Sequence, residues 1–499
     1  MESQEIKPQN PNNEEIITNK KLSLFAALIP IIVLVGMLAY NVLGVYGDNA
    51  LGGSNQFVLL MGAAVAAIIG FIHKIKYEVM LEEIAHNFKS TGGAILILLF
   101  VGALSGTWLI SGIIPSMIYY GLDILNPKIF LPASVIICSI ISIATGSSWT
   151  TSATVGIALI GIGNALGIPI GMTAGAVISG AYFGDKISPL SDTTNLAPAM
   201  AGTDLFTHIR YMLITTVPSI VLTLIIFTII GLNLDTSGAP DIHLIKNSIS
   251  KSFYITPWLF LVPVLVILMI IKKTQPLIAL LIGTLLGGLF ALIFQPEIVI
   301  HAAGNDLEGL GTFSQYYKGV MNAITTDVAI PTTDESLNDL FSSGGMAGML
   351  NTIWLILCAM SFGGVMEAIG ALSKITASLL KLFNTVFGLF ASTVASCLAL
   401  NVTASDQYLA IVVPGKMFAQ AYKDKGLAPE NLSRTLEDSG TVTSALVPWN
   451  TCGAYQSKVL LGEAGLTSYI PYTFFNIISP FMTLLFAALS IKIRMLKDK

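Results

Sequence analysis

Long apolar segments recur along the whole chain and are separated by short polar connections. A helix needs about 20 apolar residues to cross the hydrocarbon layer of a bilayer, which is roughly 30 Å thick. Ten segments qualify when interruptions within a segment are allowed, and they predict about ten transmembrane helices. These segments are 22–43, 57–73, 92–114, 169–202, 206–232, 255–271, 275–294, 345–370, 428–460 and 468–491.

Two further apolar stretches contain polar interruptions at matching places in the two halves. One interruption is Thr-Gly-Ser-Ser-Trp-Thr-Thr-Ser at 145–152, and the other is Asn-Val-Thr-Ala-Ser-Asp-Gln-Tyr at 401–408. Shifting 126–156 by 258 places lays it on 384–414 without a gap, and seven of the 31 positions are then identical. The order of the flanking elements repeats as well. Because each half has an odd number of full spans, the sequence predicts two repeats of inverted topology, as in secondary transporters.

The lengths of the pieces beside these interruptions favour re-entrant hairpins. Segments such as 152–166 and 386–400 hold about 15 residues, or roughly 22 Å of helix. Two complete thin spans per pair remain an alternative with the same outer topology. A second interruption in each half, at 184–195 and 446–453, contains a proline that breaks the helix. The freed carbonyls and clustered hydroxyls there suit a desolvated alkali cation.

Composition excludes most other classes of protein. Apolar residues make up 54% of the chain and charged residues only 11%, whereas soluble domains carry about 25% charged residues. This excludes a soluble enzyme, a nucleic-acid binder and a disordered chain. The four cysteines lie in apolar stretches without a C-x-x-C spacing, so we expect neither disulfides nor a zinc site. We therefore expect an all-α polytopic membrane protein that is no enzyme and needs no cofactor.

Basic residues predict the orientation, because basic loops resist translocation. In the ten-span arrangement 19 of the 25 Lys and Arg residues fall on one side and five on the other, with Lys186 inside the membrane. Both termini are therefore expected in the cytoplasm. The predicted organisation is a cytoplasmic tail at 1–21, a first repeat at 22–232, a connecting loop at 233–254, a second repeat at 255–491 with an external loop at 295–344, and a cytoplasmic tail at 492–499.

Three carboxylates lie in or beside the interruptions: Asp185, Asp192 and Asp406. An ionisable group at such a depth is a functional candidate by default. A carboxylate in a low-dielectric pocket can hold a proton or a sodium ion but not both, which is the chemistry of a proton/cation exchanger. The alternative is that 185–192 forms a cytoplasmic loop with helix caps, and that Asp406 caps a hairpin tip.

Four charged residues lie on one predicted helix near the second helix break. Glu430 and Arg434 are spaced as an i, i+4 ion pair, and Arg434 and Asp438 have the same spacing. For Glu430 and Arg434 we expect an ion-paired helix entrance at the cytoplasmic face. Glu437 and Asp438 lie deeper and are candidates for a proton path.

The motifs at 184–198, 430–444 and 447–453 closely resemble those of the NhaC family of bacterial sodium/proton antiporters. The resemblance extends over nearly the whole chain from about Leu22. The family is grouped with the ion transporter superfamily, whose better-known members are similar to homodimers of scaffold and transport domains that move like an elevator. The resemblance implies a multi-pass protein of the bacterial cytoplasmic membrane that exchanges Na⁺ for H⁺ and can form a homodimer.

Carried over to this sequence, the resemblance implies two pseudo-symmetric cation sites. The first combines the hairpin tip at Ser147, Ser148 and Thr151 with the break at Ser188, Asp192, Thr193, Thr194 and Asn195, beside Asp185. The second combines Asn401, Thr403, Ser405 and Asp406 with Asn450 and Thr451. The second break has no acidic counterpart of Asp185 and Asp192, so we do not expect two equal sodium sites.

A coupled exchanger of small organic anions is the alternative function. Some family members are similar to malate/lactate exchangers driven by sodium and protons. A carboxylate substrate would need a cationic partner, and the only intramembrane candidates are Lys186 and Arg434. This scarcity favours sodium/proton exchange.

Overall fold

The computed structural model describes residues 17–19, 21–46, 53–124, 126–234, 242–272, 274–305, 307–332, 341–381, 385–462 and 467–496. Helices form nearly all of this part of the chain, and its two short strands, β1 (Val328–Ala329) and β2 (Ser342–Ser343), pair antiparallel. The expected all-α polytopic architecture is confirmed. The parts of the expected tails and loops at 1–16, 47–52, 235–241, 333–340 and 497–499 lie outside the described residues.

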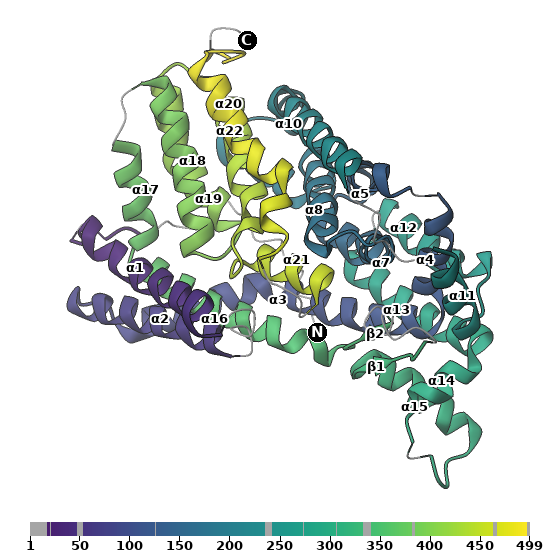
Figure 1. Cartoon of the computed structure of the whole chain (residues 1–499). Helices are drawn as coiled ribbons and strands as arrows, with labels where there is room; N and C mark the ends of the chain where they lie inside the picture. The colour runs from purple at the N-terminus through teal and green to yellow at the C-terminus, as the bar shows by residue number, and fades with distance from the viewer. Residues whose placement is uncertain are drawn as a thin grey trace, which may run out of the picture.

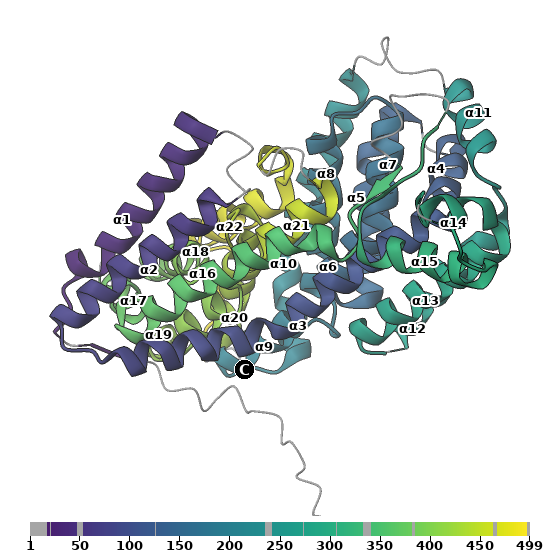
Figure 2. The ribbon, with the colours of Figure 1, turned by 90° about the horizontal axis from the view of Figure 1, so that it is seen from below.

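One group of helices lies in the lower half of the molecule as it is drawn in Figure 1. Its members are α1 (Leu24–Tyr40), continued by η2 (Asn41–Tyr46), α2 (Ser54–Ile72), α3 (Tyr77–Ile110), α13 (Pro276–Phe294) and α16 (Leu350–Ala368). The helix α3 packs against both α13 and α16, and α16 packs against α2 as well; Figure 2 shows α3 running beside α16. With 34 residues, α3 is about 51 Å long. It begins well before residue 92, the predicted start of this span, because an apolar segment marks only the part of a helix that suits lipid.

Two helical hairpins form at the first pair of interruptions. In the first, α5 (Pro127–Thr145) ends at Gly146, and the chain returns through α6 (Ser148–Thr151), η4 (Ser152–Gly156) and α7 (Ile157–Ala165). In the second, α18 (Val386–Thr403) returns as α19 (Leu409–Asp424). The expected breaks within 145–152 and 401–408 are confirmed. Whether the hairpins are re-entrant stays a prediction, since α5 and α18 are each long enough to span a bilayer.

Two broken helices form at the second pair of interruptions. The helix α8 (Ile170–Ile187) stops before Ser188, and α9 (Asp192–Ala201) begins four residues later. In the other half, α20 (Pro429–Leu436), η8 (Glu437–Thr441) and η9 (Ser444–Leu446) precede α21 (Thr451–Leu461). Ser188 and Val447 are extended because the residue before a proline avoids the helical conformation. Pro189 and Pro448 thus end the helices as expected.

The remaining elements complete the bundle and one peripheral region. They are α4 (Ile113–Ile124), α10 (Leu205–Asn233), α11 (Ile242–Ser252), η5 (Pro257–Phe260), α12 (Leu261–Ile271), α14 (Pro296–Ala302), α15 (Thr312–Thr325), η7 (Ala347–Met349), α17 (Ala371–Lys381), η10 (Ile470–Tyr472) and α22 (Phe474–Ala488). The expected loop at 295–344 therefore contains two helices and both strands. Its helix α15 packs on α3, so this region is partly folded against the bundle.

Eight helices of the described residues are long and apolar enough to cross a membrane, or nine if the bent pair α11 and η5/α12 is one span. The expected spans 169–202 and 428–460 are absent from this set, and helix breaks divide both of them. The expected span 468–491 contains the short η10 and the 15 residues of α22, so its longest helix is shorter than a full span. Large apolar side chains such as Phe25, 73% exposed, and Ile32, 63% exposed, face outward. Outward apolar surface of this extent suits lipid rather than water.

Candidate functional site

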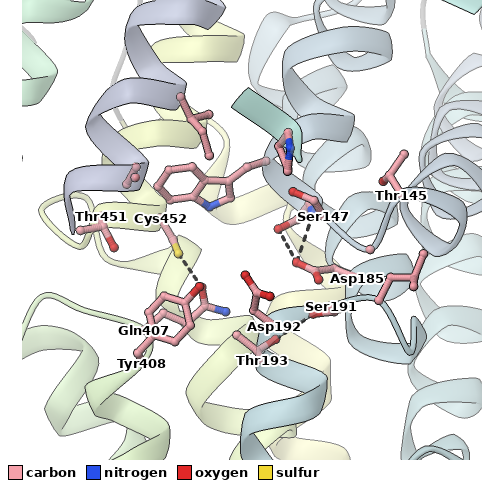
Figure 3. A pocket seen from close by; sticks show the side chains of 18 of the residues that line it. Thr145, Ser147, Asp185, Ser191, Asp192, Thr193, Gln407, Tyr408, Thr451 and Cys452 are labelled. Carbon is pink, nitrogen blue, oxygen red and sulfur yellow. Dashed lines mark hydrogen bonds between the residues drawn. The ribbon is translucent and has the colours of Figure 1, made fainter. Parts of the chain in front are cut away.

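A cavity of about 510 Å³ lies where both hairpin tips meet both helix breaks (Figure 3). The first tip contributes Thr145 to Trp149, and the second contributes Asp406, Gln407 and Tyr408. The breaks contribute Asp185, Leu190 to Thr193, Thr451 and Cys452. The rest of the wall comes from α3 and from the turn between α12 and α13. Segments far apart in the sequence therefore build one site.

The first tip is held against the first break by close packing and by a buried carboxylate. Gly146 has a φ of 68°, and a Cβ atom there would lie 2.6 Å from the Cβ of Leu190. Only glycine permits both this backbone conformation and this approach. Asp185, which is buried, accepts hydrogen bonds from the backbone N–H (3.1 Å) and the hydroxyl (2.7 Å) of Ser148. The tip and the break thus form one unit around Asp185.

Hydroxyl and amide side chains satisfy carbonyls at the first break and near the end of α5. Ser188 donates to the carbonyl of Ile143 at 2.8 Å. Thr194 donates to the carbonyls of Asp185 (3.1 Å) and Lys186 (2.9 Å). Asn195 donates to the carbonyls at 189 and 191. These three predicted site residues therefore stabilise the break from behind the cavity wall.

Asp192 and Thr193 occupy the first turn of α9, on the cavity wall. Ser191, rather than Asp192, caps this helix by accepting from the backbone N–H of Thr194. The Asp192 side chain is exposed to the cavity. The alternative of a cytoplasmic loop at 185–192 requires Asp192 to cap a helix, and Ser191 fills that role instead.

The second tip meets the second break in the same manner. Ser405, with a φ of 58°, accepts a hydrogen bond at its carbonyl from the backbone N–H of Thr451 at 3.0 Å. Asp406 accepts from the backbone N–H of Leu409 at 2.9 Å, so it does cap the returning helix, as the alternative held. The hydroxyls of Thr403 and Ser405 are buried and have no hydrogen-bond partner among the described residues. Buried hydroxyls without a partner are available to a ligand.

Two asparagines support this second region from behind. Asn450 caps α21 by accepting from the backbone N–H of Cys452 at 3.0 Å, and it donates to the carbonyl of Asn401 at 3.1 Å. Asn401 donates to the carbonyl of Gly440 at 2.8 Å and to the hydroxyl of Thr443 at 3.0 Å. The second hairpin is therefore bonded to both sides of the second break.

The predicted site residues divide into two groups by position. The cavity wall contains Ser147, Ser148, Asp185, Asp192, Thr193, Asp406 and Thr451. The residues that lie outside the wall are Thr151, Ser188, Thr194, Asn195, Asn401, Thr403, Ser405, Glu437, Asp438 and Asn450. Thr151 donates to the carbonyl of Ser147 and so supports the first tip.

The cavity has a strongly one-sided charge. Its wall carries three carboxylates, and none of the described residues that line it is Lys, Arg or His. Such a wall attracts cations and repels anions. In the part of the chain that the structure describes, no three His, Cys, Asp or Glu side chains are close enough to hold one metal ion. A bound cation would therefore rely on hydroxyl and carbonyl oxygens in addition to a carboxylate.

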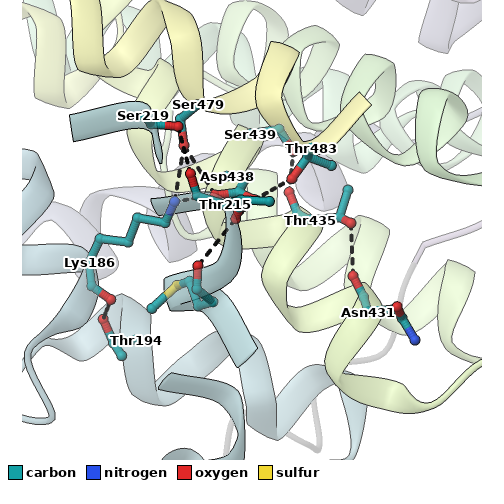
Figure 4. A network of polar contacts seen from close by, with 11 residues as sticks. Lys186, Thr194, Thr215, Ser219, Asn431, Thr435, Asp438, Ser439, Ser479 and Thr483 are labelled. Atoms are coloured by element: carbon teal, nitrogen blue, oxygen red, sulfur yellow. Dashed lines mark hydrogen bonds and ion pairs between the residues drawn. The ribbon is translucent and has the colours of Figure 1, made fainter. Parts of the chain in front are cut away.

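Several ion pairs differ from those that the sequence suggests. Lys186 directly follows Asp185, but its ammonium group pairs with Asp438 (Figure 4). The expected pair of Glu430 with Arg434 is wrong, since Glu430 pairs with Arg494 at 2.8 Å. Arg434 is buried with its guanidinium 4.7 Å from the centre of the Tyr211 ring. Spacing along one helix suggests partners within that helix, whereas the observed partners come from other segments.

Sequence reasoning missed other residues of the wall. Ser90 and Thr91 of α3 face the cavity, as do Gln407 and Cys452, and the Cys452 thiol donates to the Gln407 side chain at 2.9 Å. Gln407 lies within the polar interruption at 401–408, and this position could have identified it as a site residue. No signal of this kind marks Ser90 and Thr91, because only tertiary packing brings α3 to the tips.

Comparisons of the sequence with known proteins show its family. Residues 180–491 match the Na⁺/H⁺ antiporter family. The Na⁺/H⁺ antiporter NhaC of Alkalihalophilus pseudofirmus is 36% identical over 433 residues, which cover 87% of this chain and 90% of that protein. The malate-2H⁺/Na⁺-lactate antiporter of Bacillus subtilis is 36% identical over 85% of this chain and 87% of its own length. The arginine/ornithine antiporter ArcD of Halobacterium salinarum is 32% identical over 95% of this chain and 93% of its own length. The chain belongs to the Na⁺/H⁺ antiporter family.

Proposed function

We propose that the protein is a secondary active transporter that exchanges sodium ions for protons across the bacterial cytoplasmic membrane. The observation that carries this function is the cavity between tips and breaks, whose described wall holds three carboxylates and no basic side chain. Family membership and the names of relatives such as the Na⁺/H⁺ antiporter NhaC support it. The transported ions, Na⁺ and H⁺, are then the cargo of the site rather than resident cofactors.

The first cation site is proposed around Asp185 and Asp192, with hydroxyl oxygens from Ser147, Ser148 and Thr193. Asp185 accepts two hydrogen bonds from the first tip. A sodium ion at Asp185 would compete with these two donors for the carboxylate oxygens. A proton on Asp185 would leave the carboxyl group fewer sites that accept hydrogen bonds. Occupancy by Na⁺ or H⁺ would therefore change how the tip is held.

The second site is proposed around Asp406 and Thr451, with the two buried hydroxyls of Thr403 and Ser405 as further ligands. Alkali cations favour such neutral oxygens when they lose their hydration shell. The predicted residues Asn401 and Asn450 would position this site rather than bind the ion. Glu437, whose carboxylate oxygens are buried without a hydrogen-bond partner among the described residues, is the proposed member of the proton path.

The proposed orientation has both termini in the cytoplasm, with repeats at 22–232 and 255–491. Packing supports the repeats: α3 and α16 hold corresponding places, and α3 contacts α13 as α16 contacts α2. Each hairpin tip also contacts the helix break of its own half. A homodimer, as in similar proteins of the superfamily, is part of the same proposal.

Exchange of small organic anions is the second candidate function. The cavity is larger than a bare sodium ion needs and falls within the usual range of small-molecule pockets. The malate-2H⁺/Na⁺-lactate antiporter is a relative of similar identity. However, an anion would meet no basic side chain among the described residues of the wall, which is why sodium/proton exchange is preferred.

Purified protein in liposomes that enclose a pH-sensitive dye tests the two candidates. An imposed Na⁺ gradient should move protons in the opposite direction without any organic substrate. Asp192→Asn should lose this response at unchanged protein content. Proton movement that requires malate or lactate on one side would select the organic-anion exchanger and contradict the proposed function.

A further inference from the structure

Lys186 and Asp438 form an ion pair that is completely buried behind the cavity (Figure 4). Both side chains are 0% exposed. One carboxylate oxygen of Asp438 accepts from Lys186 and, at 3.1 Å, from Ser479. The other accepts from Thr215 at 2.8 Å and from Thr483. Each oxygen therefore has two donors, and the carboxylate is fully satisfied.

The pair joins the two broken helices. Lys186 lies in the last turn of α8, two residues before the break begins at Ser188. Asp438 lies in η8, a short π-helical segment before the second break, and π-helical segments often mark functional sites. Thr215 adds α10, and Ser479 and Thr483 add α22. Four elements thus meet at this one carboxylate.

The pair is also one link in a chain of contacts between the hairpins. Asp185, next to Lys186, is bonded to Ser148 of the first tip. The segment η8, which carries Asp438, accepts at Gly440 a hydrogen bond from Asn401 of the second hairpin. The end of α8 is therefore bonded on one side to the first tip and on the other side to a segment that holds the second hairpin.

Stability alone does not account for this arrangement. Removing two charges from water costs several kcal/mol per ion, and apolar replacements of such pairs are often neutral or stabilising. We propose that Lys186 and Asp438 are positioning residues for ion exchange, which keep the two helix breaks and their ligand oxygens in register. The inference rests on the proposed function. It gives Asp438 a positioning role and removes it from the proposed proton path.

Other titratable groups surround the pair and enter its test. Glu437 and His208 interact electrostatically with both members. His208 is buried on α10 and contacts the hydroxyl of Ser433 at 2.7 Å. Arg434 lies one turn before Asp438, and Asp185 precedes Lys186. No charged residue occurs on α22. A change in the pair should therefore alter the pH profile of transport through Asp185 and Glu437.

Sodium-dependent proton flux in liposomes, measured over a range of pH and sodium concentrations, tests the inference. Lys186→Met/Asp438→Leu replaces the pair with apolar groups and should fold. Its sodium KM should rise about tenfold or more, since displacements near 1 Å can cost up to 100-fold, and its pH profile should shift. Lys186→Arg, which keeps the charge, should have a sodium KM close to that of the wild-type protein. Lys246→Gln is the matched control, because it breaks the exposed pair with Asp123 and should change nothing.

Two mild variants keep the inference testable if the double variant does not fold. Thr215→Val and Thr483→Val each remove one donor to Asp438 and leave the ion pair in place. Each should raise the sodium KM about tenfold, the lower end of the effect of one lost hydrogen bond to a charged group. A folded double variant, or both threonine variants, with the wild-type KM and pH profile would overturn the positioning role. Absence of exchange by the wild-type protein would instead contradict the proposed function.

Discussion

Each of the three cavity carboxylates has a different set of contacts. Asp185 is bonded to the first tip, Asp406 caps the helix that leaves the second tip, and Asp192 is the one exposed to the cavity. Local hydrogen bonds occupy acceptor sites on a carboxylate that a cation would otherwise use. We therefore propose that Asp192, whose side chain is the most exposed of the three, exchanges a proton and a sodium ion with the least rearrangement.

Asp192→Asn tests this competition for the same oxygens. In the wild-type protein the apparent sodium affinity should fall about tenfold per pH unit below the carboxylate pKa, because each bound proton excludes an ion. The asparagine keeps the size and one oxygen but does not titrate. Exchange and the pH dependence of residual sodium binding should be lost together. Calorimetric titration with Na⁺ at two pH values measures both.

Asp204→Asn is the matched control for this measurement. Asp204 is exposed at the start of α10 and accepts from the backbone N–H of Thr207 at 2.9 Å. Hydrogen bonds from Thr207 hold the pKa of the Asp204 carboxyl below its usual range. This group stays ionised near neutral pH, so its replacement should leave sodium binding and its pH dependence unchanged. Unchanged pH dependence in Asp192→Asn as well would place the exchanging carboxylate elsewhere.

Among the elements, the contact between the first tip and the first break makes a prediction about Gly146. Gly146→Ala should place a Cβ 2.6 Å from that of Leu190 and separate the tip from the break. The transport rate should fall about tenfold or more, because the ligand oxygens on the two segments move apart. Liposome flux and the thermal midpoint of unfolding measure the two effects separately.

Gly304→Ala separates backbone strain from this close approach. Gly304 has a φ of 80°, but a Cβ atom there would meet no described atom within 4 Å. In both alanine variants the free energy of unfolding should fall by about 1–2 kcal/mol, because alanine is strained in the left-handed backbone conformation. Only Gly146→Ala should also lose transport. Equal transport in the two variants would mean that the contact between tip and break is not needed for exchange.

The sequence predicted the elements of the site better than its contacts. A proline acts on the backbone within a few positions of itself. The breaks at Pro189 and Pro448 could therefore be located from the sequence. The partner of Lys186 could not, because Asp438 is 252 residues away and no local pattern links them. Neighbouring residues on a helix point about 100° apart. That angle lets Asp185 face the tip while Lys186 faces the other broken helix.

At the scale of the whole molecule, pairing within and between the halves argues for an inverted repeat. The helices α3 and α16 contact each other at the centre, and each also contacts the second helix of the other half. Residues of both tips line the same cavity, so the two proposed cation sites lie beside each other. Under the proposed function, this shared cavity would give Na⁺ and H⁺ a common path.

The inverted repeat makes a prediction about membrane sidedness that tests the whole arrangement. Lys74 and Glu308 are both exposed and lie in connections between predicted spans. Because 19 of the 25 basic residues fall on one side, Lys74 should face the cytoplasm and Glu308 the outside. In a variant without other cysteines, a membrane-impermeant maleimide should label Glu308→Cys in intact cells and Lys74→Cys only after permeabilisation. Labelling of Glu308→Cys only in permeabilised cells would contradict the inverted repeat, since the loop at 295–344 would then lie on the wrong side of the membrane.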